Sequence, residues 1–345
     1  MAAPTPPKRS ILIAARLITA VVSLAGAEAV LWLGGYPRWW AMDPQWGTTP
    51  PEYESNSVLG WQNREGRFNL AWPGLAGTTL VTNWSHGRRA TAEREPAGDT
   101  NRPRVFFFGD SFMQGYELSD SQTMPWIVQH HHPELNVSNF GTGDYATYQS
   151  YLAIKKWVHG PASVYHLFND FHEGRNAADP NWLRVYKKTR GGFFFPYTEL
   201  TRAGDLPERK SEGDLVWPLS RHLRTVAMIQ DYRDMWESLG RVRKKRQLTE
   251  TLLVKMNEAV RAEGGIFTVM LVDMTPEERN DYRKFLGSQN IRFIDCDHPE
   301  LKDRKLRLPD GHPDQALNEL FAQWIEPLQV VTNRGAEARS LSERQ

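Results

Sequence analysis

The fold follows from the stretch Val105-Phe106-Phe107-Phe108-Gly109-Asp110-Ser111-Phe112. Its first four residues form a continuous apolar run, which indicates a strand buried on both faces, as in a parallel sheet. The glycine that follows permits a tight backbone turn. Because open α/β sheets place their sites at the carboxyl ends of the strands, Ser111 is expected at the rim of the sheet with its hydroxyl exposed.

Short apolar runs of strand length recur along the chain. They cover Leu135 to Asn139, Ala162 to Phe168, Ile266 to Leu271 and Ile291 to Ile294. Helical patterns separate several of them: Thr147 to His159, an apolar face from Leu248 to Val260, a capped start at Thr275-Pro276-Glu277-Glu278, and a last helix from Asp314 to Ile325. Strands that alternate with helices predict an α/β fold in three layers, with a parallel sheet covered on both faces.

The N-terminus carries a candidate transmembrane helix. Lys8 and Arg9 precede an apolar stretch from Ile11 to Gly35, which Arg16 and Glu28 interrupt. About 20 apolar residues suffice to cross a bilayer. The aromatic residues that follow are Tyr36, Trp39 and Trp40, as expected at a membrane interface. Basic residues on the N-terminal side place the rest of the chain outside the cytoplasm.

A cleaved signal peptide is the competing interpretation. It would end at Ala25-Gly26-Ala27, a pattern of small residues that suits a cleavage site. The apolar run from Ala29 to Leu33 continues past that point and favours a retained anchor. Both interpretations export the following domain, so we expect it to be periplasmic or extracellular. A buried helix of a soluble protein fits Arg16 and Glu28 poorly.

Composition limits the classes of function. The chain has 345 residues, of which 42 are basic and 41 acidic, and this near balance gives no reason to expect nucleic-acid binding. The single cysteine, Cys296, excludes an internal disulfide and a cysteine-based metal cage. The adjacent residues His130-His131-His132 are expected at the surface, since neighbouring histidines at a helix end rarely converge on one ion. We expect no cofactor and no metal.

Changes in composition and pattern along the chain predict how it divides into segments. Residues 1–40 form a cytoplasmic stub and the anchor, 41–100 a small β-rich lead-in, 101–330 the main domain with an insertion at 176–245, and 331–345 a disordered tail. Within the lead-in, strands are expected at Arg67 to Trp72 and Thr78 to Asn83. Within the insertion, we expect a hairpin whose arms are Trp182 to Tyr186 and Phe193 to Tyr197. A long helix from Leu219 to Leu239 follows, closed by the basic run Arg241 to Arg246.

A serine is a weak nucleophile until a base removes its proton. Asp310 and His312 lie two residues apart in a loop directly before the last helix. There the carboxylate can hold the imidazole tautomer and leave the other ring nitrogen free to accept the serine proton. Asp295-Cys296-Asp297-His298 offers an alternative aspartate and histidine at a strand end. His312 is preferred because its loop and the following helix match the expected end of the domain.

Acyl transfer also requires donors for the negative charge that develops on the carbonyl oxygen. The strand that ends at Asn139 leads into Phe140-Gly141-Thr142-Gly143-Asp144, a glycine loop able to present a backbone N–H. The strand that ends at Phe168 leads into Asn169, whose side-chain amide is a second donor. The first three strands thus deliver a nucleophile and two donor groups to the same edge.

With these residues the chain resembles the GDSL-type lipase/acylhydrolase family, also called SGNH hydrolases, over roughly residues 104 to 174 and 265 to 327. Gly109-Asp110-Ser111 matches the first block of the family, which implies that Ser111 is the nucleophile and that its N–H contributes to the oxyanion hole. The second block implies Gly143, or else Gly141, and the third implies Asn169. The fourth implies Asp310 and His312. The resemblance further implies a flavodoxin-like α/β/α fold.

The chain departs from the family pattern at two places. Leu167 stands where the third block usually has glycine, and only Gly311 separates Asp310 from His312. The short spacing is similar to that of O-acetyl esterases and acetyltransferases of envelope polysaccharides. A membrane-anchored bacterial subgroup is also similar, through Leu59-Gly60-Trp61 and the element Asn83, Gly87 and Arg88.

The resemblance implies a serine esterase that acts, through an acyl-enzyme, on an acylated small molecule or polysaccharide. An O-acyltransferase with the same triad and a non-catalytic carbohydrate-binding protein on the same fold are the alternatives.

Overall fold

The computed structural model describes residues 9–39, 48–72, 76–95, 102–190, 192–201, 203–211, 216–296, 298–326, 328–331 and 338–340, without the side chains of 187–190 and 338–340. Some sequence-based expectations fall outside these ranges. They concern Lys8, Trp40, Gly191 of the expected turn, Asp297 of the alternative dyad, and most of the expected tail.

Within the described residues, an eight-stranded sheet has the order β12-β11-β8-β6-β7-β5-β4-β3. Its parallel strands are β6 (Arg104–Phe108), β7 (Asn136–Asn139), β8 (Ser163–Phe168), β11 (Ile266–Leu271) and β12 (Arg292–Asp295). Numbered along the chain, these strands stand in the order 2-1-3-4-5, which is the flavodoxin-like arrangement. The predicted parallel α/β sheet is therefore confirmed.

The lead-in extends this sheet. Its strands β3 (Gly66–Ala71), β4 (Thr78–Trp84) and β5 (Arg88–Arg89) continue antiparallel from β7. The two strands expected in this region thus exist, and they belong to the main sheet. A separate hairpin of β1 (Tyr53–Asn56) and β2 (Gly60–Asn63) precedes them.

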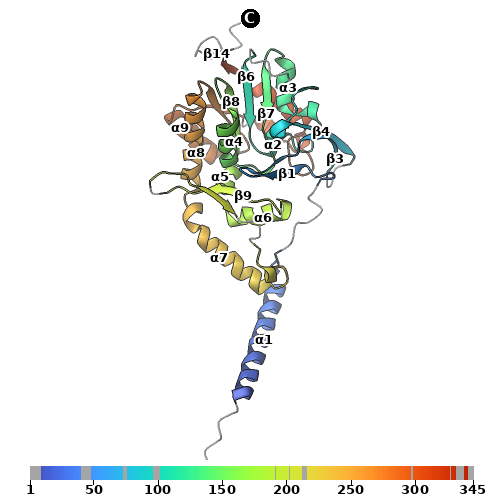
Figure 1. Ribbon diagram of the computed structural model, residues 1–345, viewed down its shortest axis with the longest axis vertical. Helices are drawn as coiled ribbons and strands as arrows, with labels where there is room; N and C mark the ends of the chain where they lie inside the picture. Colours follow the sequence, from blue (N-terminus) through green and yellow to red (C-terminus); the bar gives the residue numbers. More distant parts are fainter. Residues whose placement is uncertain are drawn as a thin grey trace, which may run out of the picture.

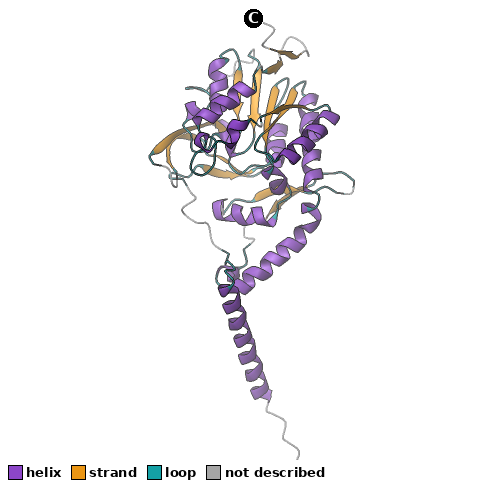
Figure 2. Ribbon diagram, turned by 180° about the vertical axis from the view of Figure 1, so that it is seen from behind, coloured by secondary structure: helices purple, strands orange, loops and turns teal. Residues whose placement is uncertain are grey.

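Helices cover both faces of the sheet (Figure 2). One face packs against α4 (Thr147–Trp157), α8 (Lys245–Ala262) and α9 (Pro276–Ser288), and the other against α3 (Met124–His131) and α10 (Gln315–Trp324). Alternate residues of β8 serve the two layers, with Val164 on the first side and Tyr165 on the second. Two caps fix helix starts near the expected positions, since Thr275 accepts the Glu278 N–H and Asp314 accepts the Leu317 N–H.

The insertion differs from the predicted hairpin. The expected first arm, Trp182 to Tyr186, lies in helix α6 (Pro180–Arg190), whose first turn contains a proline and follows Asp179. Trp182, Leu183 and Tyr186 all pack against the core cluster, and their helical spacing places them on one face.

The expected second arm does form a strand, β9 (Phe195–Thr198), but it pairs with β10 (Glu208–Ser211). Helix α5 (Phe171–Asn176) ends where the insertion begins, and the other helix of the insertion is α7 (Arg224–Val242). Short 3-10 turns occur at η2 (Ser85–Gly87), η3 (Asp120–Gln122), η4 (Pro218–Arg221), η5 (Pro299–Lys302) and η6 (Arg304–Leu306).

Helix α1 (Arg9–Leu33) projects from the head of the molecule as a stalk (Figure 1). It has 25 residues, is long and apolar enough to cross a membrane, and none of its residues is buried. At the far end of the head, β13 (Gln329–Val331) pairs with β14 (Ala338–Ser340), which forms a strand inside the segment expected to be disordered. Because β13 lies beside the start of β12, the carboxyl ends of the parallel strands face the stalk side.

Candidate active site

Ser111 begins helix α2 (Ser111–Gln114), and Gly109 and Asp110 connect it to the end of strand β6. The Asp110 side chain caps this helix, because its Oδ1 accepts the Phe112 N–H at 3.0 Å. A side chain at Gly109 would place its Cβ 2.9 Å from that of Met113 and 3.1 Å from that of Leu167. Close packing of helix and strand, rather than a positive φ, therefore requires glycine at this position.

Ser111, His312 and Asp310 form a chain of hydrogen bonds. The Ser111 Oγ lies 2.8 Å from His312 Nε2, and His312 Nδ1 lies 2.6 Å from Asp310 Oδ2. The other carboxylate oxygen of Asp310 accepts the backbone N–H of His312 at 3.0 Å. Burial raises the pKa of the Asp310 carboxyl, but its bonds to His312 outweigh burial, and the net pKa is lowered. The ionised carboxylate thereby fixes the orientation of the imidazole toward the serine.

The loop that carries His312 is held by Arg307. Its guanidinium donates to the Gly311 carbonyl at 2.8 Å and to the Leu301 carbonyl at 2.7 Å, and it pairs with Asp273 at 3.2 Å. Gly311 itself has a φ of 97°, a left-handed conformation that favours glycine. Sequence reasoning did not single out Arg307, because its partners are backbone atoms and a distant aspartate.

Two aromatic rings flank the imidazole. The centroid of Tyr116 lies 4.6 Å and that of Phe112 lies 5.6 Å from the centroid of His312. The neighbouring carboxyl of Glu117, whose side chain is buried, has its pKa raised to about 7 by burial and by the charge of Asp310. The sequence did not predict that Glu117 lies beside the proposed triad.

Asp110 lies at the centre of a buried polar network. Its Oδ2 accepts a hydrogen bond from Asn169 Nδ2 at 2.8 Å, pairs with Arg175 at 3.2 Å, and lies 3.5 Å from His172 Nε2. Burial raises the pKa of this carboxyl, but the groups around it outweigh burial and hold the pKa well below its ordinary value. Asp110 therefore braces the loop that carries Ser111.

Asn169 and the glycine loop lie beside the serine. The bond from Asn169 to Asp110 occupies one of the two amide hydrogens, which leaves the other for a ligand. The loop is tied to Gly109, whose carbonyl accepts the Thr142 N–H at 3.2 Å. The Ser111 N–H lies in the first turn of α2, where no intrahelical acceptor exists.

The surroundings of Gly141 and Gly143 differ. The Gly141 N–H donates to Asn139 Oδ1 at 2.8 Å, and a Cβ at this glycine would lie 2.3 Å from the Gln114 nitrogen. The N–H of Gly143 donates to none of the described residues. Of the two alternatives, the geometry therefore favours Gly143 as a donor, and Gly141 has a packing role.

Residues of the lead-in hold this loop from behind. The buried Trp61 donates its indole N–H to the Gly143 carbonyl at 3.0 Å, and Asn63 donates to the Gly141 carbonyl at 2.9 Å. In the sequence, Trp61 was noted only within Leu59-Gly60-Trp61, an element shared with a membrane-anchored subgroup, and this hydrogen bond was not predicted.

The other candidates lie apart from the serine. His298 stacks on Trp324 at 4.1 Å between centroids, and Asp295 pairs with Arg283. His131 and His132 both approach Glu326, as expected for surface histidines. Within the described part of the chain, no cluster of side chains suits a metal ion. Phe195, in the expected second arm of the hairpin, is fully buried in the core.

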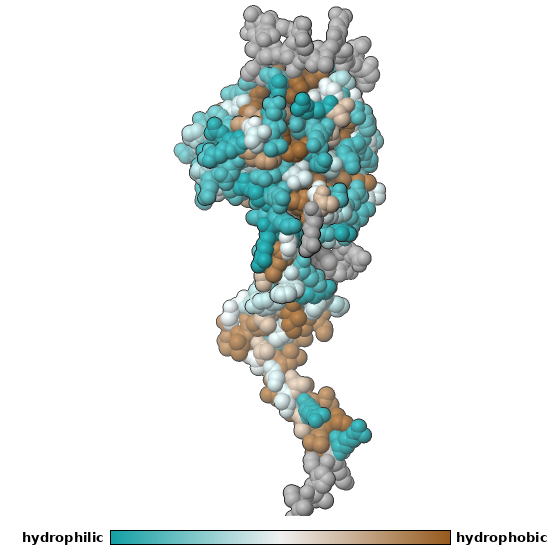
Figure 3. Space-filling view, turned by 90° about the vertical axis from the view of Figure 1, so that its left-hand side faces the viewer, coloured by the Kyte–Doolittle hydropathy of each residue, from teal (hydrophilic) through white to brown (hydrophobic). Residues whose placement is uncertain are grey.

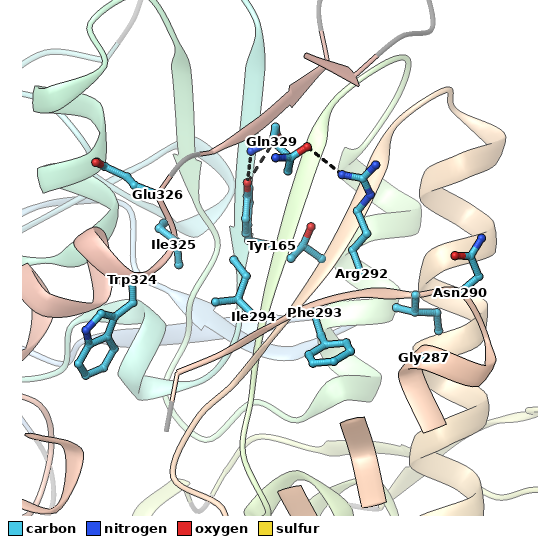
Figure 4. Close-up of a pocket in the computed structure, with 12 residues that line it drawn as sticks. Tyr165, Gly287, Asn290, Arg292, Phe293, Ile294, Trp324, Ile325, Glu326 and Gln329 are labelled. Carbon is cyan, nitrogen blue, oxygen red and sulfur yellow. Dashed lines mark hydrogen bonds between the residues drawn. The ribbon is translucent and has the colours of Figure 1, made fainter. Parts of the chain in front are cut away.

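A hollow of about 470 Å³ lies elsewhere on the head (Figure 4). Its walls include Arg292, Asn290 and Trp324, and Arg292 bonds to the side chain of Gln329. These residues lie at the amino-terminal half of the sheet or beyond it, whereas Ser111 lies past the carboxyl end of β6. This hollow is therefore separate from the proposed triad.

No protein-family model and no curated protein matches the chain. Similar solved structures include a member of the lipolytic protein G-D-S-L family from Veillonella parvula, with 14% identity, 65% of this chain and 97% of that chain covered, and a TM-score of 0.37. A psychrotrophic esterase from Pseudoalteromonas shows 10% identity, 65% and 94% coverage, and a TM-score of 0.36.

A variant of an acetyl xylan esterase from Geobacillus stearothermophilus shows 13% identity, 65% and 92% coverage, and a TM-score of 0.34. These TM-scores are low, so the fold is assigned from the strand order of this chain and the site from its own geometry.

Proposed function

We propose that this chain is a serine esterase of the SGNH type, with Ser111 as nucleophile, His312 as general base and Asp310 as the residue that orients the base. One observation carries the proposal. The 2.8 Å contact between Ser111 Oγ and His312 Nε2 joins groups 201 residues apart in the sequence, and Asp310 extends it at 2.6 Å. A hydroxyl, an imidazole and a carboxylate in this order activate a serine for acyl transfer.

In the proposed reaction, Ser111 Oγ attacks the carbonyl carbon of an ester while His312 Nε2 takes the serine proton. The tetrahedral intermediate collapses, and His312 returns the proton to the departing alcohol. Water then attacks the acyl-serine with the same assistance and releases the carboxylic acid. Asp310 stays ionised throughout and stabilises the imidazolium that forms in each step.

Three donors are proposed for the oxyanion: the N–H groups of Ser111 and Gly143 and the amide of Asn169. Two observations support this proposal. The N–H groups of Ser111 and Gly143 have no acceptor among the described residues, and the Asn169 amide keeps one hydrogen free of a bond to the protein. Preorganised donors of this kind are commonly worth about 10²–10³-fold each in rate.

The substrate class we propose is an O-acylated carbohydrate of the cell envelope or outside the cell. The short spacing of Asp310 and His312, which is similar to that of O-acetyl esterases of envelope polysaccharides, supports this class, and α1 suits an anchor that keeps the domain at the membrane. The accompanying organisation is an anchor within 1–40, a lead-in at 41–100 and a catalytic domain at 101–330 that lies on the periplasmic or extracellular side.

The test uses the full chain in detergent, with p-nitrophenyl acetate as substrate and a fluorophosphonate probe as covalent label. We expect the wild type to hydrolyse the ester and to carry the label on Ser111. Ser111→Ala should lose label and roughly 10⁴-fold or more in kcat, whereas the exposed Ser121→Ala should retain both. An unlabelled wild type, or full turnover by Ser111→Ala, would refute the assignment.

An acetylated oligosaccharide as donor and an unacetylated one as acceptor extend the test to the substrate. Free acetate identifies the hydrolase, and transfer of the acetyl group to the acceptor identifies an O-acyltransferase with the same triad. A chain that binds the oligosaccharide but neither releases nor transfers acetate would be a binding protein.

A further inference from the structure

Helix α7 has its polar and apolar faces reversed. The side chains that it directs into the molecule are largely polar, and the side chains that it exposes are largely apolar. The exposed ones are Ile229 at 53%, Tyr232 at 61%, Met235 at 48%, Trp236 at 78% and Leu239 at 36%. Their spacing of three and four residues places them on one stripe of the helix. A helix on the surface of a soluble domain shows the opposite arrangement.

The inward face is held by hydrogen bonds. Asp231 accepts from the indole of Trp39 at 2.9 Å, from Arg184 at 2.9 Å and from the hydroxyl of Tyr36. Gln230, which is buried, accepts from the hydroxyl of Ser220 at 2.7 Å. These bonds fix the rotation of α7, so its apolar stripe cannot turn inward without breaking them.

The N-terminus of α7 is joined to α1. Glu28 accepts the backbone N–H groups of Arg224 at 2.9 Å and Thr225 at 2.6 Å, and also the Thr225 hydroxyl. Since Glu28 lies five residues before the end of α1, at about 1.5 Å of rise per residue the junction falls near the outer end of that helix. A carboxylate at this place satisfies the otherwise unpaired N–H groups of the α7 terminus.

The apolar stripe of α7 therefore continues the apolar surface of α1. Figure 1 shows α7 leaving the outer end of the stalk obliquely, below the head, and Figure 3 shows hydrophobic side chains along the stalk and at the neck. Membrane-spanning helices tilt by up to about 40°, which allows α7 to approach the membrane plane while the head stays outside. Arg243 and Lys244, both exposed, follow directly after α7 and suit contact with lipid phosphates.

We propose that α7 lies in the outer interface of the membrane, with Ile229, Tyr232, Met235, Trp236 and Leu239 inserted among the lipids. The molecule is then attached by two elements: α1 spans the bilayer, and α7 fixes the orientation of the head on its surface. The proposal takes α1 as the membrane span, and it does not depend on the activity of Ser111.

The test reconstitutes the full chain in vesicles of phosphatidylethanolamine and phosphatidylglycerol. Cys296, the only cysteine, is replaced by serine, and an NBD fluorophore is attached to one new cysteine at a time. The stripe positions are Ile229→Cys, Tyr232→Cys and Trp236→Cys. The matched controls are Arg233→Cys and Glu237→Cys, which are exposed on the same helix beside the stripe.

Labels on the stripe should be quenched by a doxyl group on the lipid chains and protected from aqueous iodide, and the control labels should behave in the opposite way. Equal iodide quenching at all five positions would overturn the proposal. Protection from iodide without quenching by lipid would overturn it as well, because another protein segment or a second copy would then cover the face.

A second variant separates lipid contact from local misfolding. Trp236→Lys, with the label at position 229, should lose lipid quenching and gain iodide quenching, while Glu237→Lys should change neither. If Trp236→Lys leaves the label at position 229 as lipid-exposed as before, the stripe does not dock as one surface and the proposal fails.

Discussion

The indole N–H of Trp61 donates a hydrogen bond to the carbonyl of Gly143 at 3.0 Å. Through this bond, a residue of the lead-in supports the loop that carries one of the proposed oxyanion donors. Trp61 is itself fixed by the rings of Tyr145, Tyr186 and Phe195 in the core. The lead-in is therefore part of the site, although it contributes none of the proposed triad.

Replacement of Trp61 tests this support. Trp61→Phe keeps an aromatic ring but removes the donor, so we expect a fall in kcat of roughly 10-fold, smaller than the loss of an oxyanion donor itself. The KM should change little, because Trp61 is buried and acts through the loop. Steady-state kinetics with p-nitrophenyl acetate measures both. Tyr186→Phe is the control, since its hydroxyl bonds to Phe193 in the same cluster, and an equal loss in both variants would argue for general loosening of the core.

Gly141 should tolerate no side chain. The Cβ of Gly141→Ala would lie 2.3 Å from the Gln114 nitrogen and 2.5 Å from the Met113 carbonyl carbon, both of them backbone atoms of α2. We expect destabilisation of about 1–3 kcal/mol, as for overpacked cores, measured by urea unfolding of the full chain in detergent. Gly287→Ala, in α9 with no atom near its Cβ, should be neutral or stabilising. Equal stability of the two variants would contradict the close approach.

Arg307 should act as a positioning residue for His312. Arg307→Met removes the bonds to Gly311, Leu301 and Asp273, and we expect the freed loop to misplace the imidazole. Misplacement by about 1 Å can cost roughly 10²-fold in rate. Fluorophosphonate labelling rates and kcat should fall together, while the exposed neighbour Arg304→Met should leave both unchanged. Unaltered labelling of Ser111 in Arg307→Met would show that the loop that carries His312 keeps its conformation without Arg307.

The features that the sequence predicted are those that depend on local pattern. The apolar run before Gly109 indicates a buried strand wherever it occurs, and alternating strands and helices leave few arrangements other than a parallel sheet. The sheet edge at which Ser111, Gly143 and Asn169 were expected follows from strand direction alone. His312 was identified by its position before the last helix and by its adjacent aspartate.

Features that arise from contacts between distant segments were not predicted. Trp61 and Arg307 bond to backbone carbonyls. Every residue has such a carbonyl, so the type of the accepting residue does not reveal the bond. The segment at Trp182 was assigned to a hairpin because of its aromatic residues, although Pro180 at a helix start predicts the observed α6 equally well. Helix α7 was predicted only as a long helix, with no buried face assigned to it, because periodicity shows that two faces exist but not which one is buried.

Glu117 should make stability depend on pH. Its pKa is raised from 4.5 to about 7 by burial and by the charge of Asp310, so the native state holds this proton more tightly than the unfolded chain does. Between these two values the Glu117 carboxyl is more fully protonated in the folded than in the unfolded protein, so its contribution to the free energy of unfolding falls as pH rises through that window. The glutamine of Glu117→Gln cannot ionise, so the variant should not lose the stability that ionisation of Glu117 removes from the wild type.

Thermal unfolding of the full chain in detergent, from pH 5 to pH 8, measures the difference. We expect the unfolding temperature of Glu117→Gln, relative to that of the wild type, to increase as pH rises. Above the pKa of about 7, the difference between the two unfolding temperatures should stay constant. Asp170, whose pKa burial raises to about 6, is common to both proteins and cancels in the comparison. Parallel curves across the whole range would mean that Glu117 ionises equally easily in the folded and unfolded states. Its burial beside Asp310 would then carry no electrostatic cost.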